Sequence, residues 1–345
     1  MTTESKAATV NKKNSPRTQM PKIPSKSQNQ GLAAAKAAKK DEFYTQITDI
    51  EKEIVHYRPH LKGATIFCNC DDPVESNFFR YFALNFEFLG LKKLITTHYD
   101  SEKPTYKLEI TRELDVNDDG KIDMSDAVKT PLQTNGDFRS PESIELLKEA
   151  DIVVTNPPFS LFSDYIKQLM EYNKKFLVIG NTNAVTYKEI FPYIKDEKMW
   201  IGATNYNVGM WFEVPDHYEH QKEENGKRLS RVSTSCWFTN MPFPKRYESL
   251  PLFKTYSSKE YPKYDNYDAI EVSKVAEIPE DYNGVMGVPI TFLGKWNPNQ
   301  FKIVGCSYDY GRPDGWDKDF SMSGTINGKS VYKRLLIQKK EGAKQ

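Results

Sequence analysis

The chain has 345 residues, enough to bury a sizeable core, and a formal net charge of only +1. Residues 1–40 contain nine Lys or Arg and a single acid, a balance of +8 that leaves −7 for the rest of the chain. This distribution excludes a globally basic fold, so any nucleic-acid surface on the folded part must be a local patch. Four cysteines are too few for a disulfide scaffold at this length and suit a reducing compartment; no stretch has the pattern of a signal peptide or a membrane span. We therefore expect a soluble, cytoplasmic protein.

Residues 1–39 are predicted to be a disordered basic tail. They are rich in Lys, Ser, Asn, Gln, Pro and Ala and have almost no large apolar side chains with which to form a core. Two roles remain open for this tail: contact with nucleic-acid phosphates, and a solvated linker.

Folded structure is predicted to begin near Lys40. A helical pattern runs from Ile47 to Val55, and it is followed by a strand at Thr65–Cys68, a helix over 75–88 and a strand at Lys93–Thr97. This strand–helix–strand order predicts the start of a parallel sheet.

Residues 105–132 are predicted to be an insertion that follows the strand at Lys93–Thr97. Its segment Asp115–Asp126 matches an EF-hand calcium loop at the ligand positions, the glycine and the central isoleucine, although Asp replaces the last Glu. The strand-like Tyr106–Ile110 and the early Pro131 favour a hairpin instead, because a calcium loop is flanked by helices. The hairpin is preferred and the calcium loop stays open.

The later elements alternate in the same way. Ser140 is a predicted N-cap for a helix at Pro141–Lys148. The other predictions are strands at 152–154 and 175–180, helices at 161–172 and 187–195, a polar loop at 217–231, paired antiparallel strands at 211–214 and 235–239, and short strands and turns from 242 onward.

The stretch Asn156-Pro157-Pro158-Phe159 directly follows the strand at 152–154. Ligands bind at the carboxyl ends of strands in open α/β sheets, and the two prolines restrict this loop. The Asn156 side-chain oxygen and the Pro157 carbonyl can accept the two hydrogens of an exocyclic aromatic amine, which favours its attack on a methyl donor. Phe159 can stack on the base that carries the amine. The alternative is a rigid strand-to-helix loop without chemistry.

Several further segments extend this pattern, and together they resemble the EcoRI-type adenine-specific DNA methyltransferases. The resemblance covers nearly everything after residue 40, including an atypical motif I that has carboxylates where other methyltransferases have glycines. It implies a site-specific enzyme that transfers methyl from S-adenosylmethionine to the N6 amine of adenine in duplex DNA, in restriction–modification or phage DNA protection. The segments that carry it are Asp41–Thr45, Phe67–Pro73, Gly136–Ser140, Val153–Phe159, Tyr261–Asp268 and Gly284–Leu293.

The resemblance also implies roles for individual residues. It makes Asn156, Pro157, Pro158 and Phe159 catalytic, and Asp100 is a candidate for the ribose hydroxyls, with a surface carboxylate as the alternative. The implied cofactor-binding residues are Phe43, Tyr44 and Thr45 beside the cofactor, Cys68, Asn69 and Asp71 in the turn after the first strand, and Asp137 and Phe138 at the cofactor's adenine.

Simpler interpretations remain for two of these: a core tyrosine for Tyr44 and a helix-leading turn acid for Asp137. No metal site is expected, because Cys68 and Cys70 have no partner pair at zinc spacing.

The implied fold is α/β, with a mostly parallel, doubly wound methyltransferase sheet and an antiparallel far-edge hairpin. Residues 40–241 would form the methyltransferase domain and residues 242–345 a small irregular target-recognition region, with the 217–231 loop as an accessory. The target adenine is expected to swing out of the double-stranded DNA. No protein partner is implied, a monomer is expected, and GAATTC is a candidate recognition sequence.

Two other functions stay open. RNA adenine or protein glutamine presents a planar nitrogen to the same loop, although a small RNA enzyme does not need the long C-terminal region. A catalytically silent DNA-binding or calcium-responsive module is the other alternative.

Overall fold

The structure is a computed structural model that describes residues 44–70, 72–74, 76–100, 104–214, 218–307, 311, 313 and 324–342. The chain from Asp41 to Gln345 forms one compact unit, separate from Met1–Lys40. Phe43, Asp71 and the predicted tail at 1–39 lie outside the described residues.

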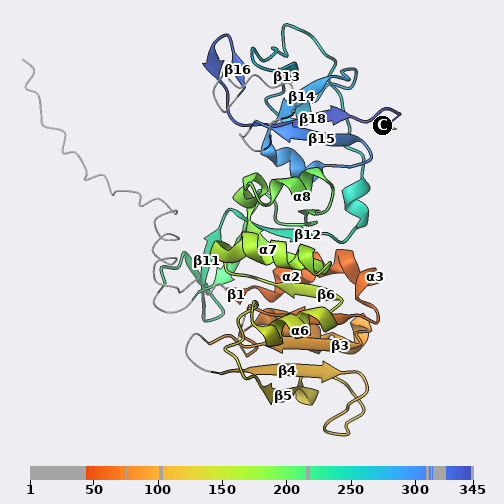
Figure 1. Cartoon of the computed structure of the whole chain (residues 1–345), viewed down its shortest axis with the longest axis vertical. Coiled ribbons are helices and arrows are strands. Elements are labelled where there is room, and N and C mark those ends of the chain that lie inside the picture. Colours follow the sequence, from red (N-terminus) through yellow and green to blue (C-terminus); the bar gives the residue numbers. More distant parts are fainter. Residues whose placement is uncertain are drawn as a thin grey trace, which may run out of the picture. The chain divides into compact units, whose positions relative to one another are not determined.

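An eight-stranded sheet in the order β5-β4-β3-β2-β6-β7-β12-β8 forms the centre of the fold (Figure 1). β3, β2, β6 and β7 are parallel neighbours, while β4 and β12 run against the strands beside them. The α/β prediction of a large, mostly parallel sheet is confirmed and is compatible with a methyltransferase fold. The strands are β2 Thr65–Cys68, β3 Lys93–Thr97, β4 Tyr106–Thr111, β5 Val128–Pro131, β6 Ile152–Thr155, β7 Lys175–Asn181, β8 Trp200–Ile201 and β12 Ser235–Thr239.

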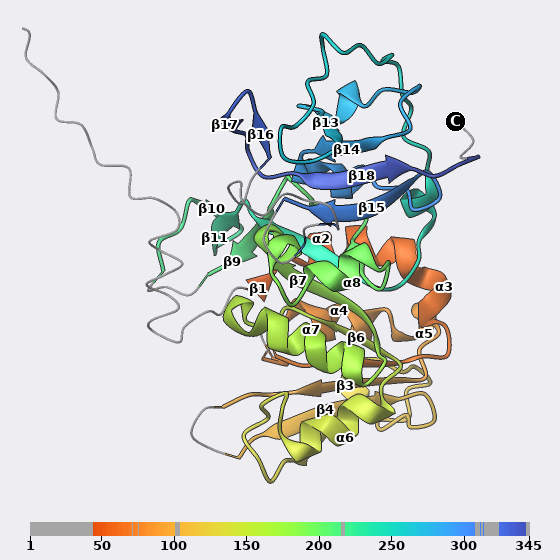
Figure 2. The same cartoon turned by 45° about the horizontal axis from the view of Figure 1, so that its top comes forward.

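Helices cover both faces of this sheet. In Figure 2, α6 and α7 lie in front of the sheet and α4 lies behind it. This follows from the strand order, because the chain moves one way from β2 to β3 and the other way from β6 to β7, and crossovers between parallel strands are right-handed as a rule. The helices are α2 Ile47–Ile54, α3 Arg58–Leu61, α4 Asn77–Leu84, α5 Phe86–Leu89, α6 Pro141–Glu149, α7 Phe162–Glu171 and α8 Phe191–Lys195.

Two predicted helices are shorter than expected. The helix predicted over 75–88 divides at Asn85 into α4 and α5, and Ser76 caps α4 by accepting a hydrogen bond from the Phe78 amide at 3.2 Å. The α-helix predicted at 187–195 comprises only α8. Ser140 caps α6 as predicted, with its hydroxyl accepting from the Ser143 amide.

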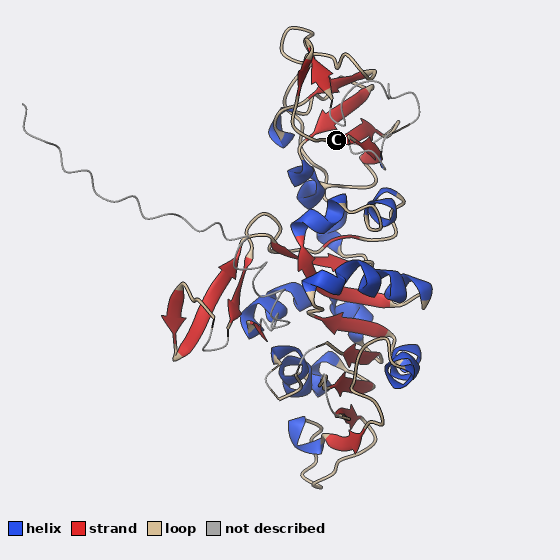
Figure 3. Ribbon diagram, turned by 60° about the vertical axis from the view of Figure 1, so that its left-hand side comes forward, coloured by secondary structure: helices blue, strands red, loops and turns tan. Residues whose placement is uncertain are grey.

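The predicted far-edge hairpin is wrong. β12 pairs with β7 and β8 in the main sheet, whereas β9 (Met210–Glu213) joins the second sheet β1-β9-β11-β10, which projects from the main sheet in Figure 3. The predicted polar loop at 217–231 is largely a hairpin of β10 (Lys222–Glu224) and β11 (Lys227–Val232). Its turn is Asn225-Gly226, where both residues have positive φ, of 52° and 74°. The remaining strand, β1, spans Tyr44–Thr45.

The insertion after β3 is the predicted hairpin, because β4 and β5 pair antiparallel. The calcium-like segment lies in their connection, where the Asp115 carboxylate accepts from the amides of Asp119 and Gly120. A single 3-10 turn, Met124–Asp126, replaces the helix expected after a calcium loop. Across the described ranges, no group of three or more His, Cys, Asp or Glu side chains is arranged to hold a metal.

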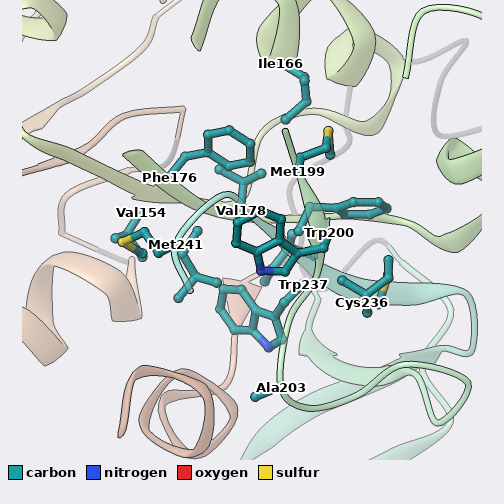
Figure 4. Close-up of a cluster of buried hydrophobic side chains, with 14 of the residues drawn as sticks. Val154, Ile166, Phe176, Val178, Met199, Trp200, Ala203, Cys236, Trp237 and Met241 are labelled. Carbon is teal, nitrogen blue, oxygen red and sulfur yellow. The ribbon is translucent and has the colours of Figure 1, made fainter. Parts of the chain in front are cut away.

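The C-terminal region has its own small sheet, β13-β14-β18-β15, and a separate hairpin, β16–β17. The hydrophobic core of the main sheet extends across four neighbouring strands. Figure 4 shows buried Val154, Phe176, Trp237 and Trp200 from these strands in one cluster. Within the described part of the chain, none of the helices could span a bilayer. The C-terminal strands are β13 Ala269–Glu271, β14 Val285–Val288, β15 Phe301–Cys306, β16 Thr325–Ile326, β17 Lys329–Ser330 and β18 Leu335–Lys339.

Candidate active site

The Asn156–Phe159 loop leaves the carboxyl end of β6, between β2 and β7. Pro157 is buried, while Asn156, Pro158 and Phe159 are half-buried. The Leu161 amide donates to the Pro158 carbonyl at 2.9 Å, which starts the short 3-10 helix that runs into α7. The loop is therefore held between a buried strand and a packed helix, with its polar groups at the sheet edge.

The beginning of α7 is fixed against β7. A Cβ added to Gly180 of β7 would lie 2.4 Å from the Phe162 ring, so a side chain at Gly180 would collide with the first residue of α7. Phe162 also packs on Phe238 of β12, with ring centroids 5.0 Å apart. This contact positions the helix that follows the candidate catalytic loop.

Two hydrogen bonds connect the loop to the turn after β2. The Thr155 hydroxyl donates to the Asn69 carbonyl, and the Tyr165 hydroxyl of α7 donates to the Asn69 side-chain oxygen. Asn69 is 3% exposed, and Tyr165 is fully buried. Burial raises the pKa of Tyr165 well above its ordinary value, so the hydroxyl stays protonated and remains a donor.

A third segment, Gly136–Ser140, packs against α7 through Phe138. Phe138 packs edge-to-face on Tyr165, with centroids 5.0 Å apart and an interplanar angle of 80°. Gln168 of α7 also donates to the Phe138 carbonyl at 3.1 Å. The α7 helix therefore contacts both the turn after β2 and the segment before α6.

Asp137 is held as a carboxylate by its neighbour. Arg139 donates from Nε to Oδ1 at 2.9 Å and from Nη2 to Oδ2 at 2.7 Å. These charge-assisted hydrogen bonds lower the pKa of Asp137. Each carboxylate oxygen has more than one acceptor direction, so the group can still accept from a ligand.

His98, just beyond β3, joins several of these segments and was missed by the sequence analysis. Its Nε2 lies 3.0 Å from Asp72 Oδ2, its Nδ1 hydrogen-bonds Thr105, and its ring stacks on Tyr106 with centroids 5.1 Å apart. Its carbonyl oxygen is so close to Gly136 that an added Cβ there would lie 2.0 Å away. The sequence feature that could have drawn attention to His98 is its position at the carboxyl end of a predicted strand.

The other predicted site residues have different surroundings. Thr45 is buried in β1, and its carbonyl accepts from Asn77 at 2.7 Å; Tyr44 beside it is half-buried. The Asp100 amide donates to the Asn135 carbonyl at 3.0 Å, which places Asp100 next to the Gly136–Ser140 segment. Cys68 ends β2 with its side chain 1% exposed in the core, so only its backbone is available at the sheet edge.

Comparison with known proteins shows the family to which this chain belongs. A family model described as "Adenine-specific methyltransferase EcoRI" matches residues 31–340. The chain belongs to this family. It is 47% identical to the Type II methyltransferase M.EcoRI of Escherichia coli, with 90% of this chain and 97% of that protein aligned. It is also 39% identical to the Type II methyltransferase M.MpnI of Mycoplasma pneumoniae, over 89% of this chain and 97% of that protein. No solved structure matched.

Family membership makes the protein an enzyme, a site-specific adenine DNA methyltransferase that uses S-adenosylmethionine. The donor set at the sheet edge fits this cofactor. The carboxylates of Asp100 and Asp137 suit hydroxyl, amino or ammonium groups, the Asn69 turn offers backbone and amide groups, and Phe138 offers a ring for the purine. The missing glycines of motif I therefore do not argue against cofactor binding.

Proposed function

We propose that the Asn156–Phe159 loop is the catalytic centre of this methyltransferase. The observation that carries the proposal is the position of Asn156 at the end of β6, in a loop joined through Thr155 to the turn after β2. The Asn156 side-chain oxygen and the Pro157 carbonyl accept the two hydrogens of the adenine amine. The nitrogen lone pair is then directed out of the ring system, and the charge that develops on nitrogen is stabilised. Phe159 stacks on the displaced adenine, and Pro158 fixes the loop.

The cofactor lies on the other side of this loop in the proposal. Asn69, the Cys68 backbone and Asp71 border its amino-acid part, Asp137 and Phe138 its adenine, and Tyr44, Thr45 and Phe43 complete the wall. Phe43 and Asp71 are assigned by the family resemblance alone. S-adenosylmethionine supplies an electrophilic methyl group on a sulfonium. The contribution of the protein is alignment for direct displacement, which needs neither a covalent enzyme intermediate nor a metal.

We further propose that residues 242–345 form the target-recognition region, with the 217–231 segment, largely the β10–β11 hairpin, as an accessory. Duplex DNA is gripped through its phosphates and read by side chains in a groove, and the target adenine turns about 180° out of the stack to reach Asn156. GAATTC is the first recognition sequence to test. The protein acts as a monomer in the cytoplasm, where its four thiols stay reduced.

The methylated positions in DNA from cells that express the protein test this proposal. We expect N6-methyladenine at one sequence in duplex DNA, and none in cells that express an Asn156→Ala variant at the same level. Equal methylation in both strains would overturn the assignment of the loop. Methylation at a sequence other than GAATTC would replace only the recognition sequence.

A further inference from the structure

Residues 324–334, called here the basic segment, combine the β16–β17 hairpin with the approach to β18. They contain Lys329, Lys333 and Arg334 and no acid, in a chain whose balance after residue 40 is −7. Because Arg334 is paired with Glu271, the positive charge that the segment offers to a ligand is that of Lys329 and Lys333. A nucleic-acid-binding protein without global positive charge needs such local basic positions.

An exposed aromatic side chain, Tyr332, lies between Lys329 and Lys333 in the sequence of this segment. Tyr332 is 79% exposed, although most aromatic side chains of comparable size are in the core. Its ring lies 5.9 Å from the Arg334 guanidinium carbon, and Lys329 beside it in the hairpin is exposed. An exposed aromatic ring with lysines close to it in the sequence is a combination with which proteins contact nucleic-acid bases and phosphates together.

The hairpin side of the basic segment is firmly braced. The Asp265 carboxylate accepts from the amides of Asn327 and Gly328 at 3.2 and 2.8 Å, and the Asn266 side chain accepts from the Thr325 amide at 3.0 Å. Asp265 and Asn266 belong to the Tyr261–Asp268 stretch that carries part of the family resemblance. This stretch holds the hairpin in shape.

The β18 side is braced as well. The Arg334 amide donates to the Ser307 hydroxyl at 2.7 Å, and the Ser307 amide donates to the Arg334 carbonyl at 2.9 Å. The Arg334 guanidinium donates to Glu271 at 2.6 and 2.9 Å, with side-chain exposures of 13% and 7% for the pair. The backbone is thus held on both sides of Tyr332, which lowers the entropy cost of ordering this segment on binding.

The β16–β17 hairpin of the basic segment lies toward the same side of Figures 1 and 2 as β1. β1 lies near the loop after β2, because Asn77 at the start of α4 donates to the Thr45 carbonyl. In Figures 1 and 2, β1, the β9–β11 sheet and the β16–β17 hairpin all lie toward the left of the view. The hairpin therefore lies toward the same side of both views as β1.

We propose that the basic segment is a contact surface for duplex DNA, an inference that rests on the proposed function. Lys329 and Lys333 contact phosphates, and the Tyr332 ring packs on a sugar or base edge in the adjoining groove. This contact holds the duplex in register while the adenine is displaced.

The test is the affinity of the full-length protein for a duplex that it methylates, measured by fluorescence anisotropy at several salt concentrations. We expect Tyr332→Ala to weaken binding by about tenfold, as for loss of one stacked ring, with an unchanged salt dependence. Tyr332→Phe keeps the ring and should bind like the wild type. Lys333→Ala should reduce the slope of log Kd against log salt by about one. The matched control is Phe88→Ala, because Phe88 is 70% exposed, has the Arg58 guanidinium carbon 5.0 Å from its ring centroid, and lies outside the proposed target-recognition region.

Unchanged melting temperatures would show that these variants are folded, as expected for exposed positions. Wild-type affinity in Tyr332→Ala, or an equal loss in the Phe88→Ala control, would overturn this inference and leave the proposed function standing. A wild-type protein that methylates no duplex would instead overturn the proposed function, and this inference with it.

Discussion

The hydroxyl of Tyr165 donates a hydrogen bond to the side-chain oxygen of Asn69, and both residues are buried. One contact therefore connects the helix after the candidate catalytic loop to the turn at which the cofactor is expected. In a direct displacement the nucleophile and the methyl donor must be aligned closely, and a rigid connection between their two binding segments provides this alignment.

Replacing Tyr165 with Phe removes this hydrogen bond and keeps the ring that packs on Phe138. The Asn69 oxygen is left buried without its donor, which should lower the free energy of unfolding by about 1–3 kcal/mol. Cofactor affinity should fall as well, which calorimetry with S-adenosylhomocysteine would measure. Tyr172→Phe at the end of the same helix is the control. Equal cofactor affinity in both variants would contradict a role for Tyr165 in placing the turn.

His98 is expected to act as a positioning residue for the cofactor site. His98→Ala breaks the links to Asp72 and Thr105, and we expect about fivefold to tenfold weaker binding of S-adenosylhomocysteine, a cost of about 1–1.4 kcal/mol. At saturating cofactor, kcat should stay within about twofold of wild type, because the reacting groups are untouched. His98→Gln can still donate to Asp72 and should restore most of the affinity. A fall in kcat with unchanged cofactor affinity would contradict this role.

The Asp137–Arg139 pair predicts a pH effect. Hydrogen bonds from Arg139 lower the pKa of Asp137 below its ordinary value of 3.8. The pair therefore contributes stability above that value, and the contribution is lost as the pH falls through the lower pKa of the folded state. Arg139→Ala should move the Asp137 titration, followed by carboxyl-carbon NMR, upward toward the ordinary value. Identical titrations in the two proteins would contradict the assigned cause.

Calcium should have little effect on this protein. The Asp115 carboxylate already accepts two backbone amides, and the Asp126 carboxylate accepts from Val116 and Asp123 at 2.7 and 2.8 Å. We expect the melting temperature to stay the same with and without millimolar calcium. A clear rise that disappears in Asp119→Ala would revive the calcium interpretation of this connection.

Strong local signals in the sequence predicted much of the fold. Short runs of apolar and β-branched residues marked β2, β3, β6 and β7, because strands buried on both faces have few strongly polar positions. Ser140 gave the start of α6 through its capping hydrogen bond. The predicted pairing of β9 with β12 is wrong. It assumed that two apolar strands close to each other in the sequence are partners in the sheet. The dipeptide Asn225-Gly226 is typical of a hairpin turn, and it would have predicted that β11 pairs with β10.

The candidate site also combines features that could be predicted from the sequence with features that could not. The position of Asn156 at the carboxyl end of a buried strand could be predicted, because the apolar run of β6 stands directly before it in the sequence. Thr155, Tyr165 and His98 could not, since their roles depend on which loops meet at the sheet edge. Tyr165 reaches Asn69 from 96 positions away in the chain, and neither residue type is distinctive in its own segment. Contacts of this kind become visible only in the folded chain.

The most direct test of the central claim is single-turnover methyl transfer to duplex DNA by Asn156→Ala, with cofactor and DNA affinities measured on the same protein. We predict a rate at least about 100-fold lower, as for loss of a polar group that stabilises developing charge, with both affinities close to wild type. Asn156→Asp, which keeps an oxygen acceptor, should retain part of the rate. A wild-type rate in Asn156→Ala would contradict the assignment of this loop as the catalytic centre.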